Sequence, residues 1–373
     1  MTPTLVFYVS CHGLGHASRV IEVINAILAR RADVRVITRT SAARWLFDRT
    51  VTPTAGRHAY HHADVDTGVV QIDSLHIDER ATVDGARAFM RTFDDRVTAE
   101  AAFLRRQGGT LVVADIPPLG IAAAKCAGLP AVALGNFTWD WIYAAYEGTG
   151  DVVRTLREVY RQADIALRLP MHGGFQAFAS IEDLPFVARR SRQPALETRR
   201  RLGLPDHERL ALVSFGGYGL DGLDLDALTR LDGYGVLMSG SAPLGEVPRP
   251  IEGGRCGSLI PLDEHAMYAA GLRYEDLVRS VDVIVTKPGY GIISECLAND
   301  TTMLYTARGH FPEYDVLVAE MPRFLRARYM DHADLFAGRW AAHLDALLEQ
   351  PAPLERPAVN GAEVAAERLL DMI

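Results

Sequence analysis

Short apolar runs alternate with amphipathic segments along most of the chain. Residues 5–10 form an apolar run rich in β-branched and aromatic side chains, and residues 16–30 carry apolar positions at helical spacing. A loop with glycine and histidine separates the two. Further strands are expected at 34–38, 110–114 and 131–134, and one long helix at 86–107. Such alternation predicts a parallel sheet covered by helices on both faces.

The alternation is interrupted once, between about residues 184 and 204, where the chain turns polar and basic. It then resumes, with strands expected at 210–215, 235–238 and 281–286 and helices at 274–280 and 292–299. We therefore expect two Rossmann-like, doubly wound α/β domains facing across a cleft, at residues 1–184 and 205–356. Residues 357–373 include an amphipathic segment after Asn360, a good helix-capping residue. We expect this last helix to cross back onto the first domain.

Length and composition agree with two globular domains. The 373 residues exceed the size at which one hydrophobic core keeps growing, and 49% of them are hydrophobic. The net charge of -8 supplies no basic field of the kind that nucleic-acid binding needs. The four cysteines lie far apart, which indicates free thiols, and no window approaches the ~20 apolar residues of a membrane-spanning helix. With no leader-like N-terminus, these features predict a cytoplasmic protein that binds no nucleic acid, and they leave peripheral membrane contact open.

A loop with two histidines follows the first expected strand. His12 and His16 bracket Gly13 and Gly15 at the point where the strand passes into the helix. Ligands of parallel sheets bind at the carboxyl ends of the strands, where helix N-termini present free N–H groups. The glycines permit close backbone approach, and both imidazoles titrate near neutral pH. A tight turn with two solvent-facing histidines is the alternative. The spacing differs from the G-x-G-x-x-G of dinucleotide-binding proteins, which disfavours a nicotinamide-dependent dehydrogenase.

Two loops in the second half of the chain have the same placement. The first contains Ser214, Gly216 and Gly217, whose hydroxyl and backbone N–H groups suit a diphosphate, although a flexible turn is the alternative. No Gly-Lys-Ser/Thr ending follows, which disfavours a P-loop NTPase. The second loop begins at Lys287, which can neutralise a phosphate, and leads to Glu295 on the next helix. This glutamate is placed to accept both hydroxyls of a ribose; a solvated helical glutamate is the alternative reading.

Two acidic pairs, Asp64 with Asp66 and Asp224 with Asp226, have the D-x-D spacing that holds a divalent metal against a sugar nucleotide. Such spacing arises often by chance in an acidic protein, and neither pair follows a clear strand. We therefore expect no metal and no other cofactor. The G-x-S-x-G and H-E-x-x-H motifs are absent, which removes the commonest hydrolase and metalloprotease signatures.

With these loops, the chain resembles the GT-B glycosyltransferase family, in the branch that includes the bacterial N-acetylglucosaminyltransferase of peptidoglycan synthesis. It looks closer still to the glycosyltransferase-like N-terminal domain of plant L-arabinokinases and its free-standing bacterial relatives. The segments that carry the resemblance are residues 8–19, 136–143 and 287–291, Ser294 with Glu295, and residues 360–365. They run from the first strand to the last helix, so that the resemblance covers nearly the whole chain.

The resemblance implies metal-independent, inverting transfer of a sugar from a nucleoside-diphosphate sugar to an acceptor hydroxyl or amine. It makes His16 the candidate base, with His12 second. The donor-binding residues that it implies are Ser214, Gly216, Gly217, Lys287, Gly289, Tyr290, Gly291, Ser294, Glu295 and Arg308. Those expected on the acceptor side are Gly13, Gly15, Arg19, Asn136, Trp139 and Asp140. The sequence carries no recognisable signature of the acceptor itself.

Two other functions stay open. A sugar-nucleotide hydrolase of the same fold carries a similar Gly-x-Gly-His-x-x-Arg loop, matched here from Gly13 to Arg19, and in it His16 would activate water. A module that binds the sugar nucleotide without turnover is the other, although two histidines beside a complete glycine loop argue mildly against it. Of Trp139 and Trp141, we expect one in the core and one at the cleft.

Overall fold

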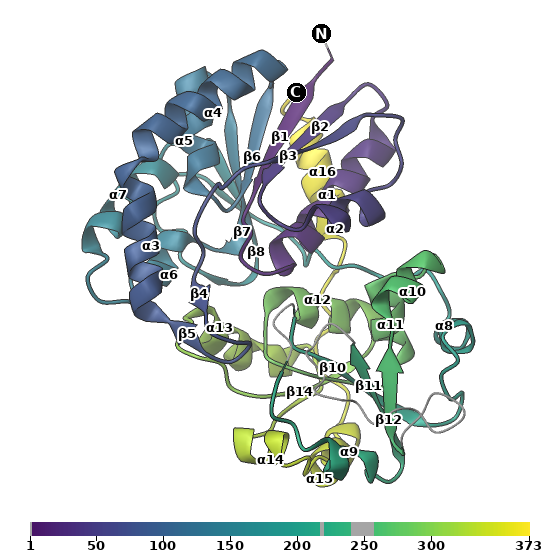
Figure 1. Ribbon diagram of the computed structural model, residues 1–373. Helices are drawn as coiled ribbons and strands as arrows, with labels where there is room; N and C mark the ends of the chain where they lie inside the picture. The colour runs from purple at the N-terminus through teal and green to yellow at the C-terminus, as the bar shows by residue number, and fades with distance from the viewer. Residues whose placement is uncertain (1, 217–219, 240–256) are drawn as a thin grey trace.

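A computed structural model describes residues 2–216, 220–239 and 257–373. It shows two α/β domains, with the first residues and the last helix both in the first domain (Figure 1). The described part of the first domain has a parallel sheet of strand order β3-β2-β1-β6-β7-β8-β9. Its strands are β1 Thr4–Val9, β2 Arg35–Thr40, β3 His58–His62, β6 Leu111–Asp115, β7 Ala131–Phe137, β8 Ile165–Gly173 and β9 Ile181–Asp183. A separate hairpin consists of β4 Val70–Gln71 and β5 Ile77–Asp78.

Helices cover both faces of this sheet. They are α1 Gly15–Arg30, α2 Arg44–Thr50, α3 Glu79–Arg91, α4 Phe93–Gln107, α5 Pro118–Ala127, α6 Trp139–Tyr143, α7 Gly150–Tyr160 and α16 Gly361–Leu370. Strand β1 shows why: Leu5 and Phe7 pack with α1, α2 and α16, whereas Val6 and Tyr8 pack with α3 to α7. Because successive side chains of a strand point to opposite faces, a wholly apolar strand needs a helical layer on each side.

The second domain repeats this design. Its described residues form a parallel sheet of strand order β12-β11-β10-β13-β14-β15. The strands are β10 Arg209–Ser214, β11 Tyr234–Ser239, β12 Leu259–Leu262, β13 Val283–Thr286, β14 Thr302–Tyr305 and β15 Ala327–Tyr329. The helices are α8 Ala195–Arg201, α9 Leu225–Thr229, α10 Glu264–Ala269, α11 Tyr274–Ser280, α12 Tyr290–Asn299, α13 Glu313–Glu320, α14 His332–Phe336 and α15 Ala341–Leu348, with a short 3-10 helix η1 Met321–Arg323.

The expected fold class, two doubly wound domains with a last helix on the first, is confirmed. Helix α16 packs on α1, and its Ala362, Ala366 and Leu369 are buried in the cluster that also holds Val20 and Ile24. One expected element is wrong, because residues 86–107 form the end of α3 and all of α4 rather than one helix. Thr92, at φ -112° and ψ 14°, leaves helical geometry between them. Its branched side chain is a poor helix former, but no glycine or proline marks the break.

The chain crosses between the domains twice, and the two crossings lie side by side. On the way out, the Phe186 amide donates to the Ala358 carbonyl (3.0 Å), and on the way back the Gly361 amide donates to the Phe186 carbonyl (2.9 Å). Val187 and Asn360 form a β-bridge at the same point. The outgoing and returning segments therefore support each other at the domain boundary.

Candidate active site

The carboxyl ends of the two sheets meet at the domain boundary. The loop with His12 and His16 follows β1, and Asp115 is the last residue of β6. From the other side, Lys287 follows β13. The two glycine turns touch, since a Cβ on Gly291 would lie 3.4 Å from the Gly15 Cα. The structure thus brings the first and third of the expected loops together.

His16 is paired with a buried carboxylate. Its Nδ1 lies 2.8 Å from Asp115 Oδ1, and Arg19 Nε donates to Asp115 Oδ2 at 2.6 Å. Although burial opposes it, the charges of Arg19 and His16 hold the pKa of Asp115 below its usual range. Because an ionised carboxylate only accepts hydrogen bonds, the bond between His16 and Asp115 requires the proton on Nδ1, although Arg19 Nη2 lies 3.0 Å from the same nitrogen. The opposite nitrogen, Nε2, is then the basic one.

Asp115 was missed in the sequence because it is a single carboxylate in the chain, 99 residues from His16. The available signal was its position, directly after the buried run at 111–114 and thus at the carboxyl end of a strand. The peptide bond from Asp115 to Ile116 is cis.

A chain of buried polar groups extends this pair into the second domain. Arg19 Nη1 donates to Asn136 Oδ1 (2.6 Å), and Asn136 Nδ2 donates to Glu313 Oε1 (2.7 Å). Glu313 begins α13 and is 5% exposed. The Arg19 guanidinium also lies 5.3 Å from the ring centre of Tyr290. The orientation of the histidine is therefore tied to the contact between the domains.

Aromatic rings surround the two histidines. The His12 ring lies 5.6 Å from Trp139 and 5.5 Å from Phe311, between centroids. Burial, followed by the charges of Arg308, His16 and Lys287, holds the pKa of His12 well below its usual value, so this imidazole is neutral at pH 7. His12 is therefore uncharged and lies beside His16, which is hydrogen-bonded to Asp115.

The two tryptophans of α6 take different places. Trp139 is 1% exposed, and its indole nitrogen donates to Asp66 Oδ2 (2.9 Å). Trp141 is half-buried and lines a pocket of about 440 Å³ at the carboxyl end of β8, together with Gly173 and Gly174. A Cβ on Gly173 would lie 2.3 Å from the Trp141 ring, so the ring lies directly on the backbone.

Two cations at the boundary lack a carboxylate partner among the residues that the structure describes. Lys287 Nζ donates to the Ser74 carbonyl, and Arg308 Nη1 reaches only the Pro288 carbonyl, at 3.4 Å, while its guanidinium lies over the Phe311 ring. Burial and then the charge of Arg308 lower the pKa of Lys287 to about 7. Half-buried cations without a counter-charge are unfavourable, so this point of the molecule favours an anion.

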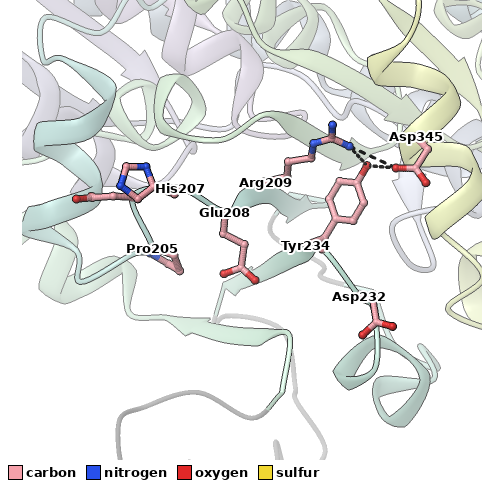
Figure 2. Close-up of a pocket in the computed structure, with 9 residues that line it drawn as sticks. Pro205, His207, Glu208, Arg209, Asp232, Tyr234 and Asp345 are labelled. Carbon is pink, nitrogen blue, oxygen red and sulfur yellow. Dashed lines mark hydrogen bonds and ion pairs between the residues drawn. The ribbon is translucent and has the colours of Figure 1, made fainter.

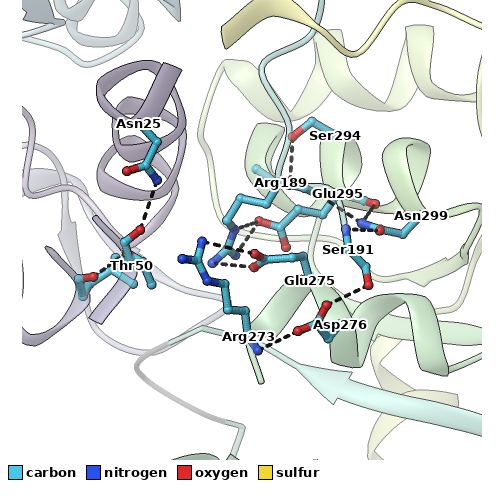
Figure 3. A network of polar contacts seen from close by, with 12 residues as sticks. Asn25, Thr50, Arg189, Ser191, Arg273, Glu275, Asp276, Ser294, Glu295 and Asn299 are labelled. Atoms are coloured by element: carbon cyan, nitrogen blue, oxygen red, sulfur yellow. Dashed lines mark hydrogen bonds and ion pairs between the residues drawn. The ribbon is translucent and has the colours of Figure 1, made fainter. Parts of the chain in front are cut away.

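Two of the other expected donor residues, Ser294 and Glu295, lie in a network of polar contacts between the domains (Figure 3). Glu295 is 4% exposed, and its Oε1 accepts hydrogen bonds from Nε (2.7 Å) and a terminal nitrogen of Arg189. The hydroxyl of Ser294 donates to the Gly291 carbonyl (2.8 Å). The Tyr290 hydroxyl accepts from the Val187 amide (3.1 Å). A ribose would share Glu295 with Arg189, and the ribose role of Glu295 stays a prediction.

The remaining expected residues lie in both domains. Ser214 is hydrogen-bonded to the hydroxyl of Tyr274, and Gly216 adopts φ 76°. Gly217 lies outside the described residues. Gly289 precedes α12 as its N-cap, and Gly13 adopts φ 70° in the exposed first loop. Asp140 accepts from Arg157 Nε (3.0 Å), while its other carboxylate oxygen is buried without a partner among the described residues.

The acidic pairs have other roles in the described structure. Asp66 accepts from Trp139, and Asp224 caps α9 by accepting from the Ala227 amide (2.9 Å). Within the described ranges, no three His, Cys, Asp or Glu side chains are grouped as metal ligands would be. In the same ranges no helix has the length and apolarity needed to cross a membrane.

A larger pocket, of about 710 Å³, lies elsewhere (Figure 2). It includes Arg209 and Tyr234, the first residues of β10 and β11, and both are hydrogen-bonded to Asp345. It therefore lies at the amino ends of the second sheet, the edge opposite to the loops described above, where ligands of doubly wound sheets do not usually bind.

Two curated proteins are similar to the chain in sequence. L-arabinokinase of Arabidopsis thaliana is 28% identical over 369 residues, which are 97% of this chain and 34% of that protein. An uncharacterized glycosyltransferase of Methanopyrus kandleri is 26% identical over 234 residues, 58% of this chain and 62% of that protein. The chain thus spans about a third of the plant relative and less than two thirds of the other. No family model matches it.

Solved structures match the whole chain in fold. The glycosyltransferase of kitacinnamycin has a TM-score of 0.64 at 17% identity, with all of both chains covered. UGT2 of Phytolacca americana, complexed with UDP-2fluoro-glucose and pterostilbene, has a TM-score of 0.59 at 12% identity and covers all of this chain, which covers 93% of it. The resemblance to L-arabinokinase and to glycosyltransferases is thereby confirmed, and the chain has the GT-B fold.

Proposed function

We propose that the protein is a glycosyltransferase that moves a sugar from a nucleoside-diphosphate sugar to an acceptor hydroxyl or amine. The observation that carries this proposal is the pairing of His16 with Asp115 on one side of the domain boundary, opposite Lys287 and Arg308 on the other. A general base and a pair of cations are the two things that displacement of a diphosphate requires. The neighbour from Phytolacca americana, which has the same fold, was solved with a UDP-sugar analogue.

In the proposed reaction, His16 Nε2 takes the proton of the acceptor as its oxygen or nitrogen attacks the anomeric carbon. The bond from that carbon to the diphosphate oxygen breaks, and the nucleoside diphosphate leaves with the bonding electrons. Asp115 holds the imidazole in the reactive tautomer and stabilises the imidazolium that forms. Attack from the face opposite the leaving group inverts the configuration at the anomeric carbon.

Lys287 and Arg308, together with the amide groups at Ser214 and Gly216, are the proposed diphosphate ligands. Their positive charge does at the leaving group what a divalent metal does in other transferases, and we therefore expect activity without added metal. On the acceptor side we propose Trp141, whose half-buried ring lines the pocket at the carboxyl end of β8.

A binding panel and one variant test the proposal. UDP, GDP, dTDP, ADP and CDP, each alone and as sugar conjugates, are screened by thermal shift without metal. A ligand at 100 times its Kd adds about 2.7 kcal/mol, enough to raise the melting temperature by a few degrees. His16→Ala should keep the nucleotide-dependent shift and lose sugar transfer by 100-fold or more.

The panel also separates the alternatives. Release of free sugar from the donor at the same rate with and without acceptors would favour the hydrolase, in which His16 activates water. Nucleotide binding without any turnover, unaffected by His16→Ala, would favour the binding module. No shift with any nucleotide would refute the assignment of Lys287 and Arg308 to the donor.

A further inference from the structure

The turn between β4 and β5 belongs to the first domain in sequence but lies on the second (Figure 1). The Ser74 hydroxyl donates to the Phe215 carbonyl (2.9 Å), and the Ser74 carbonyl accepts from Lys287 Nζ. The next residue, Leu75, accepts from the Gly309 amide through its carbonyl. Residues 72–76, the hairpin turn, therefore contact the loops after β10, β13 and β14.

An apolar anchor accompanies these polar contacts. Leu75 is 2% exposed and packs within the core cluster of the second domain, which also contains Phe215 and Val285. The backbones fit closely, since a Cβ on Gly309 would lie 3.1 Å from the Ile77 amide nitrogen and 3.2 Å from the Leu75 carbonyl oxygen. The hairpin turn thus covers this part of the second domain directly, with no side chain between.

The contacted loops are those with the proposed diphosphate ligands. In the described structure, the ammonium of Lys287 is satisfied by a neutral carbonyl of the hairpin turn instead of by an anion. An ammonium gains more from an anionic phosphate oxygen than from a neutral carbonyl oxygen, because the attraction of opposite charges is added to the hydrogen bond. A diphosphate would therefore compete well for the same nitrogen.

We propose that the hairpin turn is a displaceable cover, which occupies the diphosphate site in the free protein and leaves when a nucleoside diphosphate binds. The inference rests on the proposed function, since it takes the donor site to lie at Lys287. The hairpin suits such movement because its ladder is only two residues long on each strand, and isolated hairpins are marginally stable. Its base stays attached to the first domain, where the Val70 amide donates to the Thr82 hydroxyl (2.9 Å).

The cover lowers the apparent affinity for the donor by the fraction of molecules in which it is open. Loosening the hairpin turn should therefore strengthen binding, the reverse of what happens when a ligand-binding residue is lost. Asp73 offers a matched pair of variants. Its Oδ1 accepts from the Leu75 amide (2.7 Å) and the His76 amide (2.8 Å), and the side chain is exposed. Asp73→Ala and Asp73→Asn remove the same charge, but only asparagine keeps an oxygen that can hold the turn.

The test is titration calorimetry with inorganic pyrophosphate, without metal, at pH 7. Asp73→Ala should bind roughly tenfold more tightly than Asp73→Asn. Leu75→Ala, checked for folding by thermal unfolding, should bind more tightly than wild type. Ile72→Ala, a change on the same hairpin at a side chain that is 66% exposed, should bind like wild type. Equal affinities of the Asp73 pair, or weaker binding by Leu75→Ala, would overturn the cover.

Hydrogen exchange provides a second readout. Saturating pyrophosphate should speed up exchange of the Gly309 amide, which donates to the Leu75 carbonyl of the turn, whereas a turn that stays in place would leave this exchange unchanged or slow it. Lys287→Ala separates this inference from the proposed function. If the wild type and the Asp73 variants bind pyrophosphate no better than Lys287→Ala does, the proposed donor site is refuted. If binding is lost in Lys287→Ala but the two Asp73 variants bind equally, the donor site stands and only the proposed cover is refuted.

Discussion

The acidity of Lys287 makes donor binding depend on pH in a specific direction. Burial and then the charge of Arg308 lower the pKa of this ammonium to about 7 in the free protein, with Asp73 acting weakly in the opposite sense. Because the pKa is lowered, the positive charge is present below pH 7 and is lost as the pH rises. About half of the molecules carry it at pH 7 and about one in a hundred at pH 9. If a diphosphate binds the charged form, its affinity should fall about tenfold for each pH unit above 7.

The assay is titration calorimetry with UDP between pH 7.5 and 9.5, where the terminal phosphate, with a second pKa of about 6, is already ionised. His12 is neutral over this whole range and so cannot produce the change. Repeating the titration in two buffers of different ionisation enthalpy should show uptake of nearly one proton per bound UDP at pH 9. Lys287→Arg, which stays charged throughout, is the control and should bind with little dependence on pH. A wild-type profile as flat as that of the arginine variant would refute this reasoning.

Three further predictions concern stability. Arg19→Met leaves the buried Asp115 without its guanidinium partner and should lower the free energy of unfolding, measured by urea denaturation, by about 3–5 kcal/mol. Arg31→Met, which removes an exposed ion pair with Asp33, is the control and should change this free energy little. Gly120→Ala in α5 would place a Cβ 2.7 Å from the Tyr8 ring and should lower the free energy of unfolding by about 1–3 kcal/mol. Gly85→Ala in α3, where nothing lies within 4 Å of the added Cβ, should raise it by about 0.5–1 kcal/mol. Similar melting temperatures for the two variants would contradict the packing described. Burial, followed by the charge of Glu275, raises the pKa of Glu22 to about 7, so the folded state keeps a proton that the unfolded chain releases above pH 4.5. The free energy of unfolding therefore falls as the pH rises from about 4.5 to about 7. Glu22→Gln should therefore raise the melting temperature at pH 8 but not at pH 4, and an equal gain at both would speak against it.

The fold was predictable because each layer leaves a local pattern in the sequence. Apolar runs such as residues 5–10 and 210–215 became central strands, and the amphipathic pattern of residues 16–30 became α1. The division between α3 and α4 left no such pattern, because Thr92 alone ends one helix and begins the next. The β4–β5 hairpin was likewise not predicted, since its strands are only two residues long and its turn is held by contacts with the distant residues Phe215 and Gly309.

The candidate site was predictable in part for the same reason. His12, His16 and Lys287 stand in loops that glycines and strand ends mark locally. Asp115 and the Asn136–Glu313 bond are defined by contacts between residues 99 and 177 positions apart, which one sequence does not reveal. Glu295 was recognisable from its position after the glycine turn, but its pairing with Arg189 of the linker depends on how the domains meet.

The return of α16 to the first domain has a consequence for biosynthesis. The part of α1 that faces α16 is covered only after residues 361–370 have been added, because Ala362, Ala366 and Leu369 pack in the same cluster as Val20 and Ile24. Domains usually fold in order during synthesis. Of the two domains, the one that is synthesised first is therefore completed last, because α16 reaches it only after the second domain has been made.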